Sequence, residues 1–278
     1  MQIVPITPSV GAEVRGVAVN QLSDLDRAEL RLALVTHKVL VLREQTITSP
    51  EYVDFISTFG HVIPDDLTPQ AGHPPELGTI HIQPKERQTI NFWHMDYSFR
   101  AQPTPVLSLY SRLLPECGGD TLFTNLEAAY DGLTDATKVQ IEHLQCNHKV
   151  TETQNSAKRF TAEEFSQMVT NPPMRHPLVC TNPENGRRFL FVNVPIYCRS
   201  IVGQEDDEQA NALLASLYAH ASRPEFHFRL RWTQDTIVVW ENTHCLHYPV
   251  ADYFPHERRL WRLATQATMR PSYAAPSA

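Results

Sequence analysis

The chain has 278 residues, and its 24 lysines and arginines against 31 aspartates and glutamates give a formal net charge of -7. This acidic balance argues against a nucleic-acid partner held by phosphate contacts and favours a small-molecule substrate. The five cysteines are odd in number and lack C-x-x-C spacing, which predicts reduced thiols and neither a disulfide framework nor a structural zinc site.

The N-terminal part of the chain predicts two strands, a helix, a third strand and a second helix. Residues 3–17 alternate short apolar runs with proline and glycine, as in a strand, a turn and another strand. Residues 23–35 have an N-cap and apolar residues at helical spacing. Residues 38–43 form a brief β-branched run, which favours a buried strand, and a helix is expected from Ser49 to about residue 60.

Two segments lack regular patterns. Residues of about 61–90 are rich in proline, glycine and aspartate, which is typical of a lid or binding loop, with a solvated surface loop as the alternative. A second polar segment, about residues 147–175, contains a capping box at residues 161–164 and is predicted to be another mobile insertion with one short helix. We expect one domain, residues 1–278, with these two lid segments.

Strands dominate the rest of the chain. Short apolar runs predict strands at residues 106–110, 118–124, 177–181, 188–193, 226–232 and 236–240. Asn125 and Thr134 are N-caps of two short helices, the helix over 206–221 has one apolar face, and Asn185-Gly186 predicts a hairpin turn. Many strands without regular strand–helix alternation predict a mainly β fold of the α+β class, a sandwich or barrel with helices packed outside.

The residues of the run 89–99 are largely aromatic or β-branched, and the run contains His94 and Asp96 two positions apart. On an extended strand these two side chains share one face. Such a pair can supply two of the three ligands of a mononuclear iron site built from two histidines and one carboxylate. The alternative is a half-buried histidine whose tautomer the acid fixes. The third ligand has to come from elsewhere in the chain.

Four motifs follow one another along the chain. They are W-H-M-D at 93–96, G-G-D-T at 118–121, W-E-N at 240–242 followed by His247, and Arg258 eleven residues beyond His247. In this order and spacing the chain resembles the taurine and aryloxyacetate (TauD/TfdA) family of Fe(II)/2-oxoglutarate-dependent dioxygenases. The resemblance covers nearly the whole chain, and residues 190–193 and 247–255 are most similar to the taurine dioxygenase branch.

The resemblance implies a double-stranded β-helix core, of the jelly-roll or cupin-like kind, with flanking helices and lid insertions. It implies that Fe(2+) is held by His94, Asp96 and His247, with His244 in the same loop as the alternative third ligand. Two neutral imidazoles and one carboxylate leave a coordination face open for a 2-oxo acid and O2.

For the cosubstrate 2-oxoglutarate, the resemblance implies that Arg258 pairs with its far carboxylate, that Thr121 assists, and that Arg262 lies near its iron-bound end. Arg258 and Arg262 can share one face of a strand with Leu260 between them. Thr243 replaces an arginine that is often found at that position in the family. Without the resemblance, Arg258 would be interpreted as a surface charge, and the alternative for Arg262 is a solvated charge at the end of a strand.

The reaction implied is oxidation of an unactivated C–H bond, with 2-oxoglutarate and O2 converted to succinate and CO2. One alternative is a non-catalytic jelly-roll protein that binds a metal or a metabolite, and within the family another is an aryloxyalkanoate dioxygenase. Metal-assisted hydrolysis is a third reading, but it lacks an evident general base beside the three ligands.

The substrate is expected to be small and anionic or zwitterionic, with its acid toward Arg262. Asp65 or Asp66, if turned inward, would favour a cationic group on it. The residues expected to line its site are Asp65, Asn91, Tyr97, Phe99, Ile196, Tyr197 and Arg262. No segment resembles a signal peptide or a membrane span, so we expect a cytoplasmic protein without a membrane partner. A homo-oligomer is a family expectation only.

Overall fold

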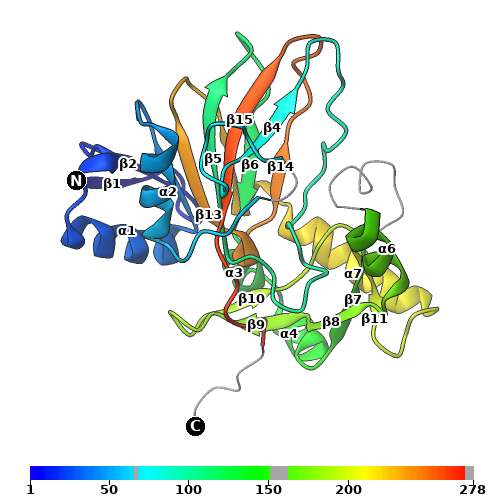
Figure 1. Ribbon diagram of the computed structural model, residues 1–278. Coiled ribbons are helices and arrows are strands. Elements are labelled where there is room, and N and C mark those ends of the chain that lie inside the picture. Colours follow the sequence, from blue (N-terminus) through cyan, green and yellow to red (C-terminus); the bar gives the residue numbers. More distant parts are fainter. Residues whose placement is uncertain (66–67, 151–161, 273–278) are drawn as a thin grey trace.

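A seven-stranded sheet forms the centre of the structure, a computed structural model that describes residues 1–65, 68–150 and 162–272 (Figure 1). Its strand order is β1-β2-β3-β13-β5-β15-β4. The strands are β1 (Gln2–Pro5), β2 (Ala12–Arg15), β3 (Val39–Leu42), β4 (Gly78–Ile82), β5 (Val106–Leu113), β13 (Ile237–Glu241) and β15 (Arg258–Ala264). Neighbouring strands are antiparallel except β2 and β3, which are parallel.

The alternation of β13 explains why it lies in the middle of this sheet. Ile237 and Val239 pack into one apolar cluster together with residues of α1 (Asp24–His37) and α2 (Ser49–Ser57). Val238 and Trp240 point to the opposite face and pack into a second cluster. Since every residue of β13 is buried, both faces of the sheet are covered, and the two helices cover the first one (Figure 1).

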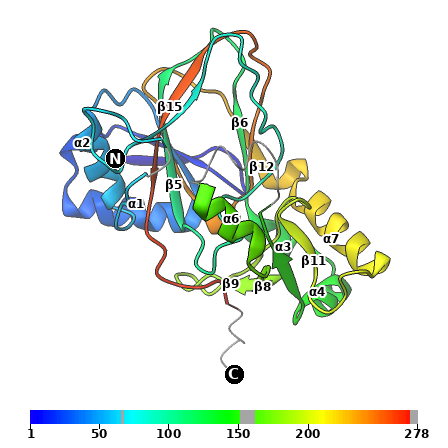
Figure 2. The same ribbon diagram turned by 45° about the vertical axis from the view of Figure 1, so that its right-hand side comes forward.

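A three-stranded sheet, ordered β12-β6-β14, covers the second face (Figure 2). Its strands are β6 (Thr121–Thr124), β12 (His227–Leu230) and β14 (His247–Pro249). Phe123 and Phe228 stack with ring centroids 5.8 Å apart and join Val238, Trp240 and Leu260 of the large sheet in one core. The expected sandwich of two sheets with helices outside is therefore observed.

The remaining elements form a further region beside the sandwich, and this region contains a third apolar cluster (Figure 2). Its helices are α3 (Leu126–Asp131), α4 (Asp135–Ile141), α6 (Ala162–Thr170) and α7 (Glu208–Ala221), and its strands are β7 (Gln145–His148), β8 (Met174–Pro177), β9 (Val179–Thr181), β10 (Arg188–Leu190) and β11 (Cys198–Ile201). The predicted hairpin is confirmed, because β9 and β10 pair antiparallel on either side of residues 182–187. Three short 3-10 helices complete the description, η1 (Val19–Gln21), η2 (Pro224–Phe226) and η3 (Asn242–His244).

Three expectations about local structure are wrong. The segment 61–90 is not wholly irregular, because residues 78–82 form β4, whose partner β15 supplies a full row of hydrogen bonds. In 147–175 the expected short helix is present as α6, but the segment also contains strand β8, which pairs with β7. Residues 151–161, including the start of the capping box at 161, lie outside the described residues. Residues 89–99 do not form a strand: they contain one isolated bridge at His94 and a turn over residues 96–99.

The expectation that all five cysteines are reduced is also wrong. Cys146 on β7 and Cys198 on β11 are joined as a disulfide, whereas Cys117, Cys180 and Cys245 are free. The two bonded residues are 52 positions apart, so no short spacing in the sequence indicates their contact. Among the described residues, no helix is long and apolar enough to cross a membrane.

Candidate active site

Two histidines from distant parts of the chain meet at the start of β14. The backbone N–H of His94 donates to the carbonyl of His247 at 2.9 Å, and the N–H of His247 donates back to the carbonyl of His94 at 2.8 Å. The imidazole centroids are consequently only 4.1 Å apart. The ring of His247 also packs against Trp240, with centroids 5.2 Å apart, so the core of the sandwich fixes its position.

Asp96 lies in the turn that follows, and two asparagines hold the backbone of that turn. Asn242 accepts from the N–H of Asp96 at 3.2 Å and donates to its carbonyl at 2.9 Å. Asn193 accepts from the N–H of Met95 at 3.0 Å and donates to the Met95 carbonyl at 2.9 Å. Tyr97 has a φ of 60°, a left-handed conformation that a strand cannot contain.

The side chains of His94, Asp96 and His247 converge. One ligand atom from each lies within 4.8 Å of the other two, and His94 Nε2 is 3.7 Å from Asp96 Oδ1. The Nδ1 of His94 lies 2.9 Å from the carbonyl of Phe92, which can only accept, so Nδ1 carries the proton and Nε2 keeps its lone pair. Two imidazoles and one carboxylate fit a divalent iron.

His244, the alternative third ligand, does not join this group. Its ring packs on Phe189 with centroids 4.1 Å apart, and its Nδ1 lies 3.7 Å from Glu241. Burial, with the nearby charge of Lys38, holds the pKa of His244 well below its usual value. The geometry therefore favours His247.

Arg258 is buried at the start of β15, next to the turn of the G-G-D-T motif. Its side chain is so close to Gly119 that a Cβ there would lie 3.1 Å from both Cδ and Nε of Arg258. Gly119 also has a φ of 70°, so glycine is needed here for two reasons. Thr121 accepts from the indole N–H of Trp232 at 3.0 Å, and the Trp232 ring centroid lies 5.7 Å from the Arg258 guanidinium.

The guanidinium of Arg258 has unused hydrogen-bonding capacity. Its residue is 3% exposed, and Nε and Nη2 have no hydrogen-bond partner among the described residues. Burial lowers the pKa of Arg258, although Tyr253 opposes the shift. A buried cation with two unpartnered donor atoms is costly by itself and fits a carboxylate ligand.

Arg262 lies four residues further along β15 and already has acidic neighbours. It donates to Asp65 Oδ2 at 3.1 Å and to the hydroxyl of Tyr97 at 2.9 Å, and it lies 3.7 Å from Asp96 Oδ2. Burial alone would lower the pKa of Arg262, but Tyr97, Asp96 and Asp65 together raise it above its usual value. Asp65 thus turns inward, as one expectation required, whereas Asp66 lies outside the described residues.

The other predicted substrate residues fall into two sets. The rings of Tyr97, Phe99 and Tyr197 form a chain, with centroids 6.2 and 6.1 Å apart, and all three are partly buried. Asn91 and Ile196 are exposed. The rings of Tyr97, Phe99 and Tyr197 are called the aromatic wall below, and this wall contacts Arg262 through the hydroxyl of Tyr97.

A buried charge cluster supports the loop that carries His247. Lys38 Nζ lies 2.6 Å from Glu127 Oε1 and 2.9 Å from Glu241 Oε2, and the N–H of Glu241 donates to the Lys38 carbonyl at 2.9 Å. Burial raises the pKa of Glu241 to about 7, although Lys38 acts to lower it. Sequence reasoning missed this cluster and the roles of Asn193 and Asn242. The only signal was that Asn193, Glu241 and Asn242 belong to the motifs quoted above.

Comparison with known proteins gives a consistent result. The model of the family described as "Taurine catabolism dioxygenase TauD, TfdA family" matches residues 2–264. The alpha-ketoglutarate-dependent 2,4-dichlorophenoxyacetate dioxygenase of Cupriavidus pinatubonensis is 30% identical over 87% of this chain and 90% of its own length.

Two solved structures are similar over nearly the whole chain. A taurine dioxygenase from Burkholderia xenovorans is 30% identical, with a TM-score of 0.81 over 97% of this chain and 92% of that one. AAD-2 in complex with Mn(II) and N-oxalylglycine is 27% identical, with a TM-score of 0.79 over 98% and 99%. The predicted jelly-roll class is thereby confirmed, although the sheets of this chain do not close into a barrel.

Proposed function

Because the chain belongs to the taurine catabolism dioxygenase TauD, TfdA family, whose members are Fe(II)- and 2-oxoglutarate-dependent dioxygenases, we propose that it oxidises a C–H bond of a small anionic or zwitterionic substrate at the site described above. The protein is an oxidoreductase that uses Fe(II), 2-oxoglutarate and O2. The observation that carries the proposed site is the convergence of His94, Asp96 and His247.

The proposed iron ligands are His94, Asp96 and His247. Their chemistry suits the metal, because the protonated Nδ1 of His94 is held by the Phe92 carbonyl and the remaining nitrogen faces Asp96. Iron held by these three residues would supply the oxidative decarboxylation of 2-oxoglutarate that is coupled to oxidation of the substrate. The hydrogen bonds of Asn193 and Asn242 to the backbone of residues 95–96 would keep the Asp96 carboxylate in position for the metal.

The proposed anchor of 2-oxoglutarate is Arg258. A two-pronged pair between its guanidinium and the far carboxylate would satisfy the two donor atoms that are unpartnered among the described residues. It would also offset the cost of burying the charge. Thr121 supports this arrangement indirectly, since it fixes Trp232 against the guanidinium.

The proposed substrate contact is Arg262, with the aromatic wall of Tyr97, Phe99 and Tyr197 for the rest of the molecule. Arg262 is already paired with Asp65, so the acid of an incoming substrate competes with Asp65 for the same guanidinium. A substrate that also carries an ammonium group would give Asp65 a replacement partner. This exchange favours a zwitterion over a simple dianion.

The experiment is a titration of the anaerobic Fe(II) and 2-oxoglutarate complex with pairs of sulfonates, aryloxy acids and amino acids and their neutral esters or amides. We expect the acid of a productive pair to perturb the metal spectrum at lower concentration than its neutral partner, and Arg262→Gln to remove this preference. Asp65→Asn should weaken binding only for compounds with an ammonium group. Equal perturbation by both members of every pair would refute the anionic substrate.

The matched control is Arg259→Gln. Arg259 lies on the same strand but is exposed. It should leave every titration unchanged. Oxygen consumption with the best compound should require 2-oxoglutarate, and turnover without it would contradict the reaction class.

A further inference from the structure

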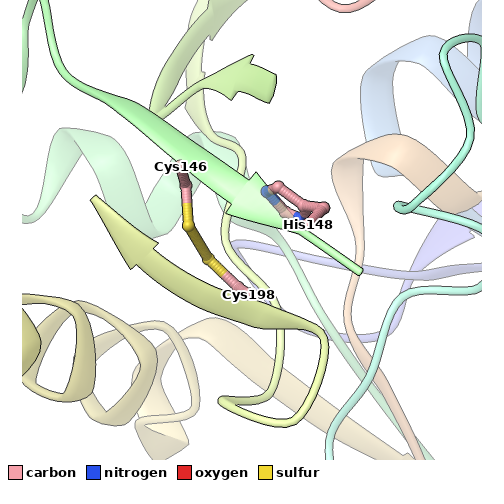
Figure 3. Close-up of side chains that lie close together, drawn as sticks. All are labelled: Cys146, His148 and Cys198. Atoms are coloured by element: carbon pink, nitrogen blue, oxygen red, sulfur yellow. A yellow bond between two sulfur atoms is a disulfide. The ribbon is translucent and has the colours of Figure 1, made fainter. Parts of the chain in front are cut away.

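Strands β7 and β11 bring together three residues that can bind a metal ion (Figure 3), and this group is separate from that of His94, Asp96 and His247. They are Cys146, His148 and Cys198, and all three are buried. Cys146 and Cys198 are bonded as a disulfide between the two strands, with Cα atoms 6.4 Å apart. One ligand atom of each of the three residues lies within 4.8 Å of the others.

The surroundings of the His148 ring point to a ligand. Its residue is fully buried, yet neither ring nitrogen has a hydrogen-bond partner among the described residues. A neutral imidazole has one N–H donor and one acceptor nitrogen, and buried polar atoms are nearly always paired. His176, whose ring lies beside that of His148 with centroids 5.3 Å apart, is different, because its Nε2 bonds with the carbonyl of Arg100 at 3.0 Å.

We propose that, when the disulfide is reduced, Cys146, His148 and Cys198 bind a zinc ion that cross-links β7 and β11 in its place. Zinc prefers cysteine sulfur and histidine nitrogen ligands. Two thiolates and a neutral imidazole balance the charge of Zn²⁺, whereas Cu⁺ would leave one uncompensated negative charge in a buried site. Three protein ligands leave the fourth zinc position to a small exogenous ligand such as water.

The chemistry of the exchange balances. A water-soluble phosphine and one water molecule convert the disulfide to two thiols and a phosphine oxide. Zinc binding then releases two protons as the thiols become thiolates. The disulfide and the zinc site use the same sulfur atoms, so they exclude each other. Either one holds the start of β11, which directly follows Tyr197 of the aromatic wall, against β7.

The test is a cobalt titration of the full-length protein, before and after reduction with the phosphine and its removal under anaerobic conditions. Cobalt bound by thiolates has a sulfur-to-metal charge-transfer band, and cobalt bound by the imidazoles and carboxylate of the iron site has none. We expect this band only in the reduced protein, where it should saturate at one thiolate-bound Co²⁺ per chain, beyond any Co²⁺ bound at the iron site, and we expect Zn²⁺ to abolish it.

Variants separate this site from other thiols. Cys198→Ser should remove most of the band, and His148→Ala should lower the cobalt affinity by about 100-fold or more, since loss of an outer-shell partner alone costs about 10- to 100-fold. Cys117→Ser, at an exposed free cysteine, should change nothing. The oxidised His148→Ala protein should keep its far-ultraviolet circular dichroism, which shows that the variant folds. A reduced protein without the band, or a band unchanged in both His148→Ala and Cys198→Ser, would overturn the proposal.

Discussion

Replacement of Arg258 by alanine should weaken 2-oxoglutarate binding strongly. A hydrogen bond to a charged group contributes about 1.5 to 3 kcal/mol, and Arg258 has two donor atoms without partners among the described residues, which gives an upper bound of about 3 to 6 kcal/mol. Truncation of one partner of a buried, hydrogen-bonded charge pair costs about 2 to 5 kcal/mol or more. We therefore expect a net loss of about 2 to 4 kcal/mol, or roughly 30- to 800-fold in the dissociation constant.

The assay is an anaerobic titration of the Fe(II) protein with 2-oxoglutarate, followed by the change in the metal absorption spectrum. It needs no substrate, so it isolates binding of the cosubstrate from turnover. Arg258→Lys should lie between the wild type and Arg258→Ala, because lysine keeps the charge but not the two-pronged geometry. Arg259→Ala is the matched control at an exposed neighbouring residue.

An unchanged dissociation constant in Arg258→Ala would refute the reasoning, and so would an equal loss in Arg259→Ala. Thermal unfolding of each variant distinguishes loss of the ligand contact from loss of the fold. Removal of an unpaired buried cation should not destabilise the protein without cosubstrate, and it can stabilise it. A variant that binds weakly but melts at or above the wild-type temperature would therefore give the clearest support.

Four further substitutions test the site and the charge cluster beside it. His247→Ala should lose iron and turnover, while His244→Ala should keep iron; metal analysis after gel filtration decides between them, and the reverse result would exchange their roles. Asn242→Ala should lower iron affinity by about 10- to 100-fold with the ligands intact, as measured by chelator competition, because it frees the backbone of Asp96. Burial raises the pKa of Glu241 to about 7, above its usual value, so its stabilising contribution is present below about pH 4.5 and is lost as the pH rises through about 7. Urea unfolding from about pH 5 to about pH 8 should then show Glu241→Gln gaining stability relative to the wild type, and a difference that does not change with pH would contradict this.

The main strands and helices could be predicted because their signals, apolar patterns, caps and turns, lie within a few neighbouring residues. The run 236–240 predicts a buried strand, and β13 is buried on both faces since its alternate residues meet two different apolar clusters. The hairpin at Asn185-Gly186 and the helix capped by Ser23 depend on turn and capping chemistry within a few residues. Strand β4 was missed because its five residues are stabilised by β15, which lies far along the chain.

The cluster of Cys146, His148 and Cys198 was missed for the same reason as β4, because it depends on strand pairing between segments that are far apart in the sequence. Cys146 and Cys198 are 52 residues apart, and the bulge between residues 198 and 200 shifts the register of β11 against β7. Their contact depends on that pairing, which spacing rules for disulfide frameworks or zinc sites do not describe.

His94 and Asp96 were predicted as metal ligands on the assumption of a continuous strand, which the structure does not contain at residues 89–99. An alternating strand would place His94 and Asp96 on one face, but the chain turns after Met95, and Asp96 reaches the site because Asn242 holds its backbone from another segment. The single bridge between His94 and His247 then aligns the two imidazoles without a continuous ladder. The segment that begins with W-E-N thus has two roles at the site. Asn242 positions the ligand Asp96, and His247, five residues later, is itself a ligand. An insertion or deletion between Asn242 and His247 would therefore disturb both Asp96 and His247, although only His247 belongs to this segment of the sequence.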